Sequence, residues 1–554
     1  MCCLLFLGPV VQADTKAEKN FKKLADEILT DLYKFYPVRS TSMGIHDYDG
    51  KFTDYSKSNV SSHYSKFKTY VTRLHKYRSV KLPLEMKIDM RALRSNCETA
   101  LLDLGKIAYH KNNPSLYIDE AIEGIYLLMI ADHLPLDQRV NSILGRMNNL
   151  PKYLEQGQEN LKKVPPVWLT YSREHINDAI DLYTGVVADL QEKLPTRQEE
   201  IKKAGNNALA ALEQFKSFLR GLTPGEPGSF AIGIEYFDYI LQHKHLLGYN
   251  NDSLLNIGEY YVSILKEEYD EKQNAMNTNR IESGIFVPPS FCAADVLEYY
   301  RWELDNIRQF IIDRDLLTIP ETVPSCKVVE TPSFMGATIT SFAYQWAPPF
   351  DSLGESVFFI KPVPELASDS LRLKYYRNII KRDLREVMTH EVWPGHHLQM
   401  ELARNQPSAA RLWQVDNVFC EGWAFYCEEM IYKAGLYADQ PEIEIKFLGA
   451  QLLRAARAVI DVKLHTGRFS YQDAVDYLVD LMGGGREYFE KEVMRYTMTP
   501  GQPMSYLAGK LAILELREEV KAREGDDFSL KDFHDRLLSV GSVSPALVGM
   551  KILQ

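Results

Sequence analysis

Apolar residues recur at three- and four-residue spacing through the first 220 residues or so, and this period restricts that part of the chain to packed helices. The pattern runs from Lys16 to about Gly221, and it places apolar side chains on one face of an α-helix. Proline-containing breaks at 134–135, 162–166 and 194–195 interrupt it, and such breaks end helices. The sequence therefore predicts a series of antiparallel helices.

A short region in the second half of the chain has a different pattern. The runs 327–330, 336–344 and 356–361 are rich in β-branched and aromatic residues and are bounded by proline and glycine, which predicts a small sheet at about 326–361. We expect 336–344 to be an edge strand with which an extended peptide could pair, the alternative being a strand with both edges covered. The fold class expected is mainly α with this one small sheet.

The breaker cluster Leu222-Thr-Pro-Gly-Glu-Pro-Gly228 predicts the boundary between two parts. The parts expected are an N-terminal helical lobe at 14–222 and a catalytic region at 223–554. Residues 1–13 are a short apolar run ending in Gln12-Ala13, as in a signal peptide. This predicts a secreted, periplasmic or otherwise extracytoplasmic protein, with membrane association left open.

Charge and hydropathy exclude some classes of partner. The net charge is −11, and no Lys/Arg-rich run with interleaved aromatics occurs, so we expect no nucleic-acid partner. No apolar run of about 18 residues follows the N-terminus, so no transmembrane segment is expected. The sequence leaves the oligomeric state open.

The segment Thr389-His-Glu-Val-Trp-Pro-Gly-His-His-Leu-Gln399 concentrates metal-binding groups. Three of the thirteen histidines fall within 390–397, and Glu391 follows the first of them. In many zinc peptidases a His-Glu pair on a helix supplies one ligand and the general base, and a second histidine follows at i+4. Here position i+4 is Pro394, so the usual spacing is absent.

An unbroken helix could not bring these histidines to one ion. It would place His396 about 9 Å along the axis from His390 and about 120° around it, and His397 about 10.5 Å away. Proline removes a backbone donor, and glycine tolerates unusual dihedrals. Our hypothesis is that Pro394-Gly395 interrupts the helix and returns His396 to the side of His390.

Zinc needs a third protein ligand, commonly a carboxylate from a second helix. Glu421 lies among Trp, Phe and Tyr residues in 416–429, and a buried carboxylate is costly unless it is paired or metal-bound. The expected ligands of one Zn²⁺ ion are therefore His390, His396 and Glu421. Glu428, seven residues later, is expected to orient a histidine or to be the alternative ligand.

The motif His-Glu-x-x-Pro-Gly-His-His-Leu-Gln resembles the signature of the DUF885 family, whose helical members are grouped with zincin-type metallopeptidases. The segments 230–237, 420–428, 461–465 and 495–506 also resemble that family. The resemblance implies a large zincin-like, gluzincin-type fold with the sheet beside the metal-site helix. The Pro-Gly-His part of the signature favours His396 over His397 as the ligand.

Other residues have expected catalytic roles. Glu391 is the expected general base, and Tyr506 the expected donor to the oxyanion, as in related metallopeptidases. Arg495 is a candidate for binding a substrate carboxylate, with an ion pair as the alternative. His465 has Asp461 at i−4 on one helix face, and its alternative is a structural hydrogen bond.

The function expected is a zinc-dependent peptidase that hydrolyses short peptides. Two alternatives remain: a zinc hydrolase of another amide or an ester, and a non-catalytic extracytoplasmic binding protein with a degenerate site.

Overall fold

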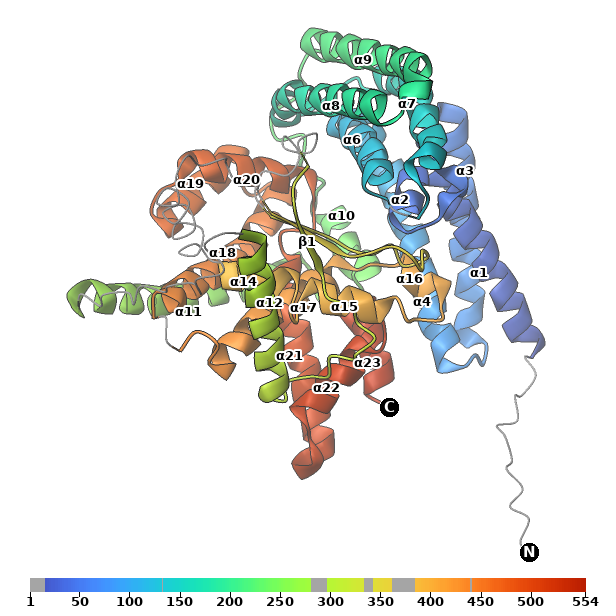
Figure 1. Cartoon of the computed structure of the whole chain (residues 1–554). Coiled ribbons are helices and arrows are strands. Elements are labelled where there is room, and N and C mark those ends of the chain that lie inside the picture. The colour runs from blue at the N-terminus through green and yellow to red at the C-terminus, as the bar shows by residue number, and fades with distance from the viewer. Residues whose placement is uncertain (1–14, 132, 280–295, 333–341, 361–383, 439–440) are drawn as a thin grey trace, which may run out of the picture.

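The computed structural model describes residues 15–131, 133–279, 296–332, 342–360, 384–438 and 441–554. The described chain is mainly helical with one three-stranded sheet (Figure 1), which confirms the predicted fold class. The predicted signal peptide, residues 1–13, and most of the predicted strand 336–344 lie outside the described residues.

The predicted helical series is present in the first part of the chain. Its helices are α1 (Lys16–Phe35), α2 (Pro37–Ser42), η1 (His46–Tyr48), α3 (Lys57–His75), η2 (Lys76–Ser79), α4 (Leu84–Leu101), η3 (Leu102–Ile107), α5 (Tyr109–Asn112), α6 (Ser115–Ile130), α7 (Leu136–Asn160), α8 (Pro166–Lys193), η4 (Pro195–Arg197) and α9 (Gln198–Gly221).

The remainder carries the sheet and a second set of helices. These are α10 (Ile234–Tyr239), η5 (Ile240–Lys244), α11 (Asn251–Asn279), α12 (Val296–Asp313), β1 (Lys327–Glu330), β2 (Ala343–Gln345), β3 (Val357–Ile360), α14 (Leu384–Glu391), α15 (His396–Ala403), α16 (Ala409–Trp413), α17 (Asn417–Ala434), α18 (Pro441–His465), α19 (Tyr471–Met482), α20 (Arg486–Met498), α21 (Ser505–Glu524), η8 (Gly525–Asp527), α22 (Leu530–Leu538) and α23 (Pro545–Ile552).

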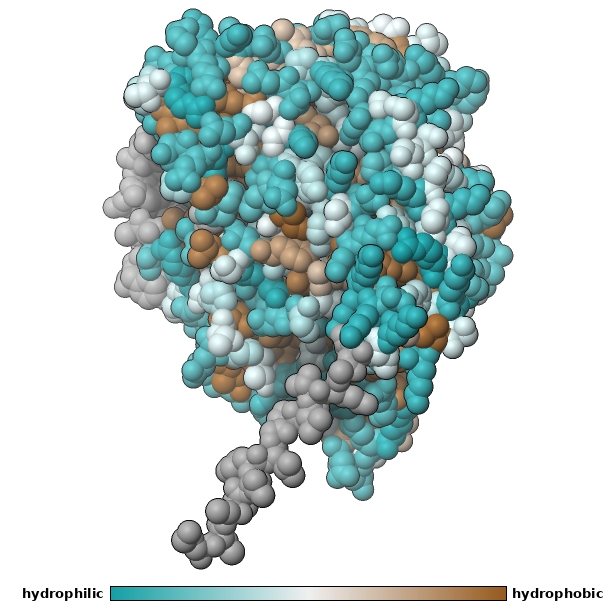
Figure 2. All heavy atoms as spheres, turned by 90° about the vertical axis from the view of Figure 1, so that its right-hand side faces the viewer, coloured by the Kyte–Doolittle hydropathy of each residue, from teal (hydrophilic) through white to brown (hydrophobic). Residues whose placement is uncertain are grey.

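Local sequence explains how the helical series begins. Thr15 and Glu18 form a capping box at the start of α1, which satisfies backbone donors that the first turn leaves free. The apolar stripe of α1, including Phe21 and Leu24, is buried, and its polar face turns to solvent. In Figure 2 the face of the molecule over these N-terminal helices is mostly hydrophilic, with hydrophobic residues in small groups.

The core continues across the predicted boundary at 222–228. One cluster of buried side chains includes Leu182 and Phe215 of the N-terminal helices together with Ile460, Leu464 and Tyr496 of the later ones. The N-terminal helices therefore pack against the second half of the chain. None of the described helices has an apolar stretch long enough to cross a bilayer.

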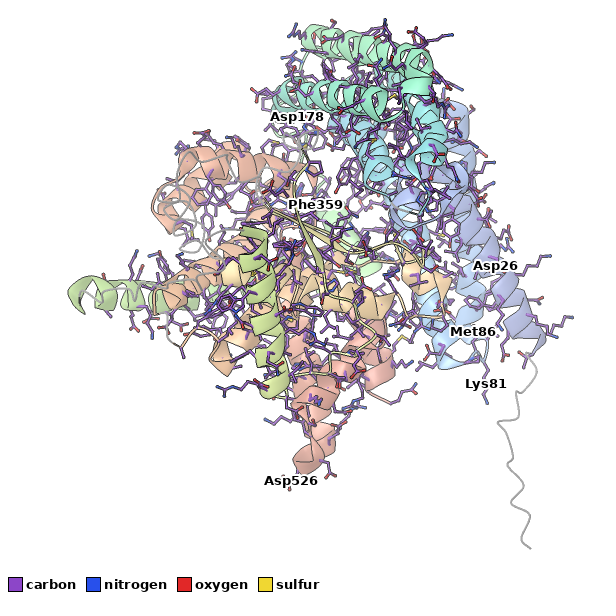
Figure 3. All side chains as sticks on the ribbon, viewed as in Figure 1. Asp26, Lys81, Met86, Asp178, Phe359 and Asp526 are labelled. Atoms are coloured by element: carbon purple, nitrogen blue, oxygen red, sulfur yellow. The ribbon has the colours of Figure 1, made fainter. Side chains whose placement is uncertain are left out.

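The sheet lies beside the histidine motif. Its order is β1-β3-β2, with β1 parallel and β2 antiparallel to the central β3. Phe359 of β3 is buried and lies in the middle of the molecule, whereas Asp526 lies at its lower end (Figure 3). Within the described residues β2 pairs only with β3, so it is an edge strand. The sheet prediction is confirmed for 327–330 and 357–360, and β2 overlaps the end of the predicted run 336–344.

Helices α17 and α21 cross at their closest where two glycines meet. A Cβ atom on Gly509 would lie 1.7 Å from the carbonyl oxygen of Val418, and one on Gly422 would lie 2.4 Å from the backbone of Gly509. Only glycine permits this approach. The crossing sets the distance between Glu421, on α17, and Tyr506, on α21.

Gly509→Ala should therefore destabilise the fold. Because the new methyl group meets backbone rather than a movable side chain, we expect a loss of about 3 kcal/mol or more, the upper end for overpacking. Urea unfolding of the full chain measures the change. Gly221→Ala, where nothing lies within 4 Å of the added Cβ, is the matched control, and equal stability of the two variants would refute the account of the crossing.

Candidate metal centre

The histidine motif is divided between two helices. Helix α14 ends at Glu391 and α15 begins at His396, and the Trp393-Pro394 peptide is cis. Gly395 donates from its backbone N to the carbonyl of Thr389 at 3.1 Å. A Cβ atom on Gly395 would lie 1.8 Å from the carbonyl oxygen of His390, so only glycine lets the chain fold back here. The hypothesis of an interrupted helix is confirmed.

The break brings three of the predicted ligands together. The rings of His390 and His396 lie 4.8 Å apart between centroids. Glu421 Oε2, from α17, is 3.4 Å from Nε2 of His390 and 3.5 Å from Nε2 of His396. One donor atom from each residue lies within 4.8 Å of the others. Both imidazoles therefore turn the same ring nitrogen toward one carboxylate oxygen.

These separations fit a shared cation better than a hydrogen bond. Hydrogen bonds to a charged partner are about 2.7–2.9 Å long. Ligands at about 2.0–2.1 Å from a tetrahedral zinc are about 3.3–3.5 Å from one another. The Oε2 atom of Glu421 has no hydrogen-bond partner among the described residues, although it is buried. Two imidazoles and one carboxylate form a donor set that suits Zn²⁺.

The side chains of the cluster shift the pKa values of one another. Burial alone would raise the pKa of the Glu421 carboxyl, but the imidazoles of His390 and His396 outweigh burial and hold that pKa well below its usual value. Burial alone would likewise lower the pKa of His390, yet Glu421 and Glu428 raise it to about 10. A cation at this position would replace the proton that holds the cluster together.

Glu428 lies behind His390. Its Oε1 atom is 2.7 Å from Nδ1 of His390, on the ring edge away from Glu421, and 2.9 Å from the guanidinium of Arg454. A carboxylate in this position fixes the ring and leaves Nε2 as the free lone pair. The geometry therefore gives Glu428 the orienting position rather than the direct one.

Glu428→Gln should weaken metal binding without abolishing it. The amide can still accept from Nδ1 of His390 but loses its charge, and we expect a loss of about tenfold to a hundredfold in metal affinity. Competition with a fluorescent zinc chelator measures the change. A complete loss of the metal would instead make Glu428 a ligand, and Glu429→Gln on the same helix is the control.

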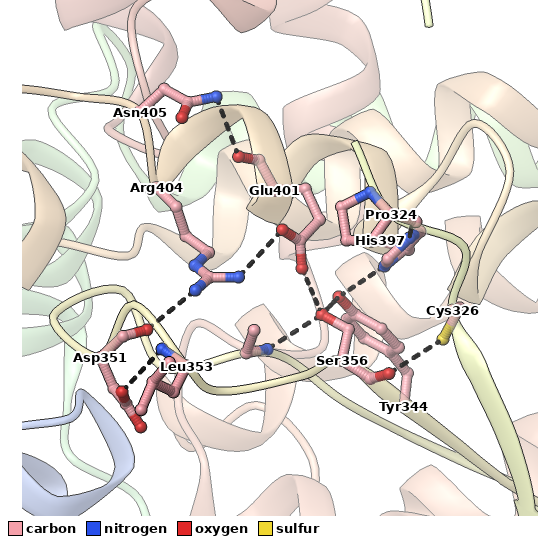
Figure 4. Close-up of polar contacts among 11 residues, drawn as sticks. Pro324, Cys326, Tyr344, Asp351, Leu353, Ser356, His397, Glu401, Arg404 and Asn405 are labelled. Carbon is pink, nitrogen blue, oxygen red and sulfur yellow. Dashed lines mark hydrogen bonds and ion pairs between the residues drawn. The ribbon is translucent and has the colours of Figure 1, made fainter. Parts of the chain in front are cut away.

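His397 is turned away from the cluster. Its Nδ1 atom is 3.3 Å from the hydroxyl of Tyr344, and its Nε2 atom is 2.8 Å from the carbonyl of Pro324 (Figure 4). Both ring nitrogens are therefore engaged, and the ring is fully buried. In this structure His396, and not His397, faces His390.

The same contacts fix α15 to the sheet. Ser356 donates to Glu401 at 2.6 Å and accepts from the hydroxyl of Tyr344 at 3.1 Å (Figure 4). Arg404 pairs with Glu401 at 3.0 Å. Because Glu401 and Ser356 are buried, the network anchors the helix that begins with His396.

Glu391 follows His390 at the end of α14. Its carboxylate forms no hydrogen bond or ion pair with any residue in the described part of the chain. It is half-buried and adjoins the cluster in sequence. A carboxylate that is unpaired within the described residues can accept a proton from a water molecule.

Tyr506 lies beside the cluster from α21. Its ring centroid is 6.1 Å from that of His390, and the guanidinium carbons of Arg454 and Arg457 lie 5.7 and 5.2 Å from its centre. Burial raises the pKa of the Tyr506 phenol to about 12, and these arginines oppose the rise. A protonated phenol near cations is a good hydrogen-bond donor.

Arg454 and Arg457 were not predicted. Helix α18 carries these two arginines, Asp461 and His465 at successive spacings of three and four residues. This spacing places all four on one helix face. This spacing was a signal that could have been used, but it does not say which helix the face meets.

His465 and Arg495 do not join the three ligands. His465 is fully buried, with Nε2 at 3.0 Å from the carbonyl of Tyr496. Its neighbour Asp461 accepts from the backbone N atoms of Gly501 and Met504, in the loop before Tyr506. Arg495 pairs with Glu492 at 2.9 Å and is 41% exposed.

The position of His465 predicts a pH-dependent stability. Burial lowers the pKa of His465 to about 4, so in the window from pH 6.5 down to 4 the unfolded chain binds a proton that the folded chain does not. As the pH falls through this window, the free energy of unfolding should decrease by at most about 1.4 kcal/mol per pH unit because of this group. Urea unfolding at several pH values should show a shallower slope for His465→Gln than for wild type. An unchanged slope, or the same change in a variant of the exposed His75, would contradict this.

Comparison with known proteins supports the family resemblance of the sequence motifs. A family model described as "Bacterial protein of unknown function (DUF885)" matches residues 37–552. No curated protein matches the chain. A solved structure of a candidate lipoprotein of unknown function from Shewanella oneidensis aligns with a TM-score of 0.77 at 20% identity, over 98% of this chain and 100% of the other.

A second solved structure, of a candidate lipoprotein from Colwellia psychrerythraea, aligns with a TM-score of 0.75 at 19% identity, over 97% of this chain and 98% of the other. At this identity the two structures show a common fold. The family match covers nearly the whole chain, so the protein belongs to the DUF885 family.

Proposed function

We propose that this protein is a zinc-dependent peptidase with a zincin-like site that hydrolyses short peptides. The observation that carries the proposal is the convergence of two Nε2 atoms on one oxygen of Glu421, at 3.4 and 3.5 Å. The carboxylate of Glu391, which has no partner within the described residues, follows His390 directly. This combination supplies three ligands and a general base within one small volume.

Each side chain of the site has a separate role in the proposed reaction. His390, His396 and Glu421 would hold Zn²⁺, which would supply Lewis acidity and lower the pKa of a bound water to about 7. Glu391 accepts a proton from the attacking water and returns it to the leaving amine nitrogen. Tyr506 donates a hydrogen bond to the oxyanion that develops on the carbonyl. Glu428 and Arg454 keep the ring of His390 in orientation.

Two further features support a peptide substrate and an extracytoplasmic location. The edge strand β2 lies beside α15 through the contact between Tyr344 and His397, and a free strand edge can pair with an extended peptide. The candidate lipoproteins with the same fold agree with the signal peptide predicted at residues 1–13.

Digestion of a mixed peptide library, read by mass spectrometry, tests the proposal. We expect cleavage that a chelator abolishes and added zinc restores. Turnover of an amide or ester library without peptide cleavage would favour the first alternative. Bound zinc with no turnover of any library would favour a binding protein and would overturn the proposal.

A further inference from the structure

A second group of metal-binding side chains lies in the N-terminal part of the chain. One donor atom from each of His46, Asp49 and His133 lies within 4.8 Å of the others. His46 begins η1 and Asp49 follows it, whereas His133 lies in the loop between α6 and α7. The candidate metal centre is built from α14, α15 and α17 instead, so the two groups share no element.

Asp49 is buried and held in place by hydrogen bonds. Its Oδ1 atom accepts from the hydroxyl of Thr41 at 2.6 Å, and that hydroxyl accepts from the guanidinium of Arg146 at 2.6 Å. Its Oδ2 atom is 2.8 Å from Nδ1 of His46. Because a carboxylate oxygen has more than one lone pair, Oδ2 can bind a cation from this fixed position.

The two imidazoles lie against each other with unpaired nitrogens. Their rings stack with centroids 3.5 Å apart and planes at 13°. Nε2 of His46 and Nδ1 of His133 are buried and have no hydrogen-bond partner among the described residues. Two stacked imidazoles repel each other if both are protonated, so at least one ring is neutral. The neutral imidazole is the form that binds a metal.

An ion in solvent can reach this group. Both histidines line a cavity of about 310 Å³ between the N-terminal helices and the sheet, and the side chain of His46 is 29% exposed. Lys327, in the wall of the same cavity, is paired with Glu355 at 3.0 Å. The charge of this lysine is therefore balanced and does not exclude a cation.

The donor atoms need a small movement to share one ion. Ligands at about 2.0–2.1 Å from a tetrahedral zinc are about 3.3–3.5 Å from one another, and the donors here are within 4.8 Å. The difference is at most about 1.5 Å. No residue in the described chain forms a hydrogen bond with the imidazole of His133, so rotation of this side chain breaks no hydrogen bond.

We propose that His46, Asp49 and His133 form a second site for a divalent transition-metal ion such as Zn²⁺. Two imidazoles and one carboxylate suit this class of ion. Binding costs the hydrogen bond between His46 and Asp49 and the stacking of the two rings, so the site is weaker than the candidate metal centre. The protein purified without added zinc therefore carries only the first ion, and the second binds when zinc is in excess.

Equilibrium dialysis of the full-length protein against increasing concentrations of free Zn²⁺ tests the proposal. We expect one equivalent to bind first and a second equivalent at higher free zinc. His46→Ala and His133→Ala should each weaken the second step at least about tenfold and leave the first step unchanged. His75→Ala, at an exposed position on α3, should change neither step.

A second measurement does not depend on how the variants fold. Crystals of the wild-type protein soaked in excess Zn²⁺ should show a second anomalous peak at the zinc edge, in contact with His46, Asp49 and His133. Saturation at one equivalent, a second equivalent that both histidine variants retain, or a second peak bound to other side chains would overturn the proposal.

The second site does not depend on the proposed function. Dialysis and anomalous diffraction need no substrate, so absence of peptide cleavage would reject the peptidase assignment and leave the second site standing. Peptide cleavage by a protein that binds only one equivalent of zinc would have the opposite meaning.

Discussion

Glu391→Gln should abolish peptide hydrolysis while leaving the metal content of the protein unchanged. The carboxylate is unpaired within the described chain and follows a ligand directly, so its replacement removes a proton acceptor without removing a metal donor. Loss of a general base costs about a hundredfold to ten-thousandfold in rate. We expect kcat to fall by at least that lower figure while bound zinc stays at one ion per chain.

Stopped assays with a peptide found in the library digest, run beside metal analysis of the same samples, measure both quantities. Glu199→Gln is a suitable control, because Glu199 is exposed on α9 and lies outside the candidate metal centre. Retained activity in Glu391→Gln would reject the role of Glu391 as the base.

His396→Ala should remove the metal, and with it the activity, whereas His397→Ala should retain the metal. The two histidines are adjacent, but only His396 turns Nε2 toward Glu421, and His397 is bound to Tyr344 and Pro324. We expect metal affinity to fall by more than the tenfold to hundredfold typical of residues behind the ligands.

The control variant, His397→Ala, has a separate expected effect on stability. Because His397 is fully buried and hydrogen-bonded, its replacement should lower the free energy of unfolding by about 1–3 kcal/mol without loss of zinc. Loss of the metal in His397→Ala and its retention in His396→Ala would reverse the assignment.

The sequence predicted the helical class and the proximity of His390, His396 and Glu421 for identifiable reasons. The apolar periodicity predicted helices α1 to α9. His390 and His396 could bind one ion only if the helix broke at Pro394-Gly395. Glu421 was found because a carboxylate among aromatic residues needs a partner. These inferences depended on local pattern, which sequence displays directly.

Other parts of the site depend on contacts between distant helices. Arg454 meets Glu428 and Tyr506 only because α18 packs beside α17 and α21. His465 proved to be bonded to the carbonyl of Tyr496, a partner that periodicity does not reveal.

The account depends on one cation between His390, His396 and Glu421. Anomalous diffraction at the zinc edge from crystals of the purified protein, together with metal analysis of the same preparation, tests this directly. We predict one zinc per chain, within about 2.0–2.2 Å of Nε2 of both histidines and of a Glu421 oxygen. A preparation in which zinc supports activity but occupies another position, such as the cluster of His46, Asp49 and His133, would contradict the account.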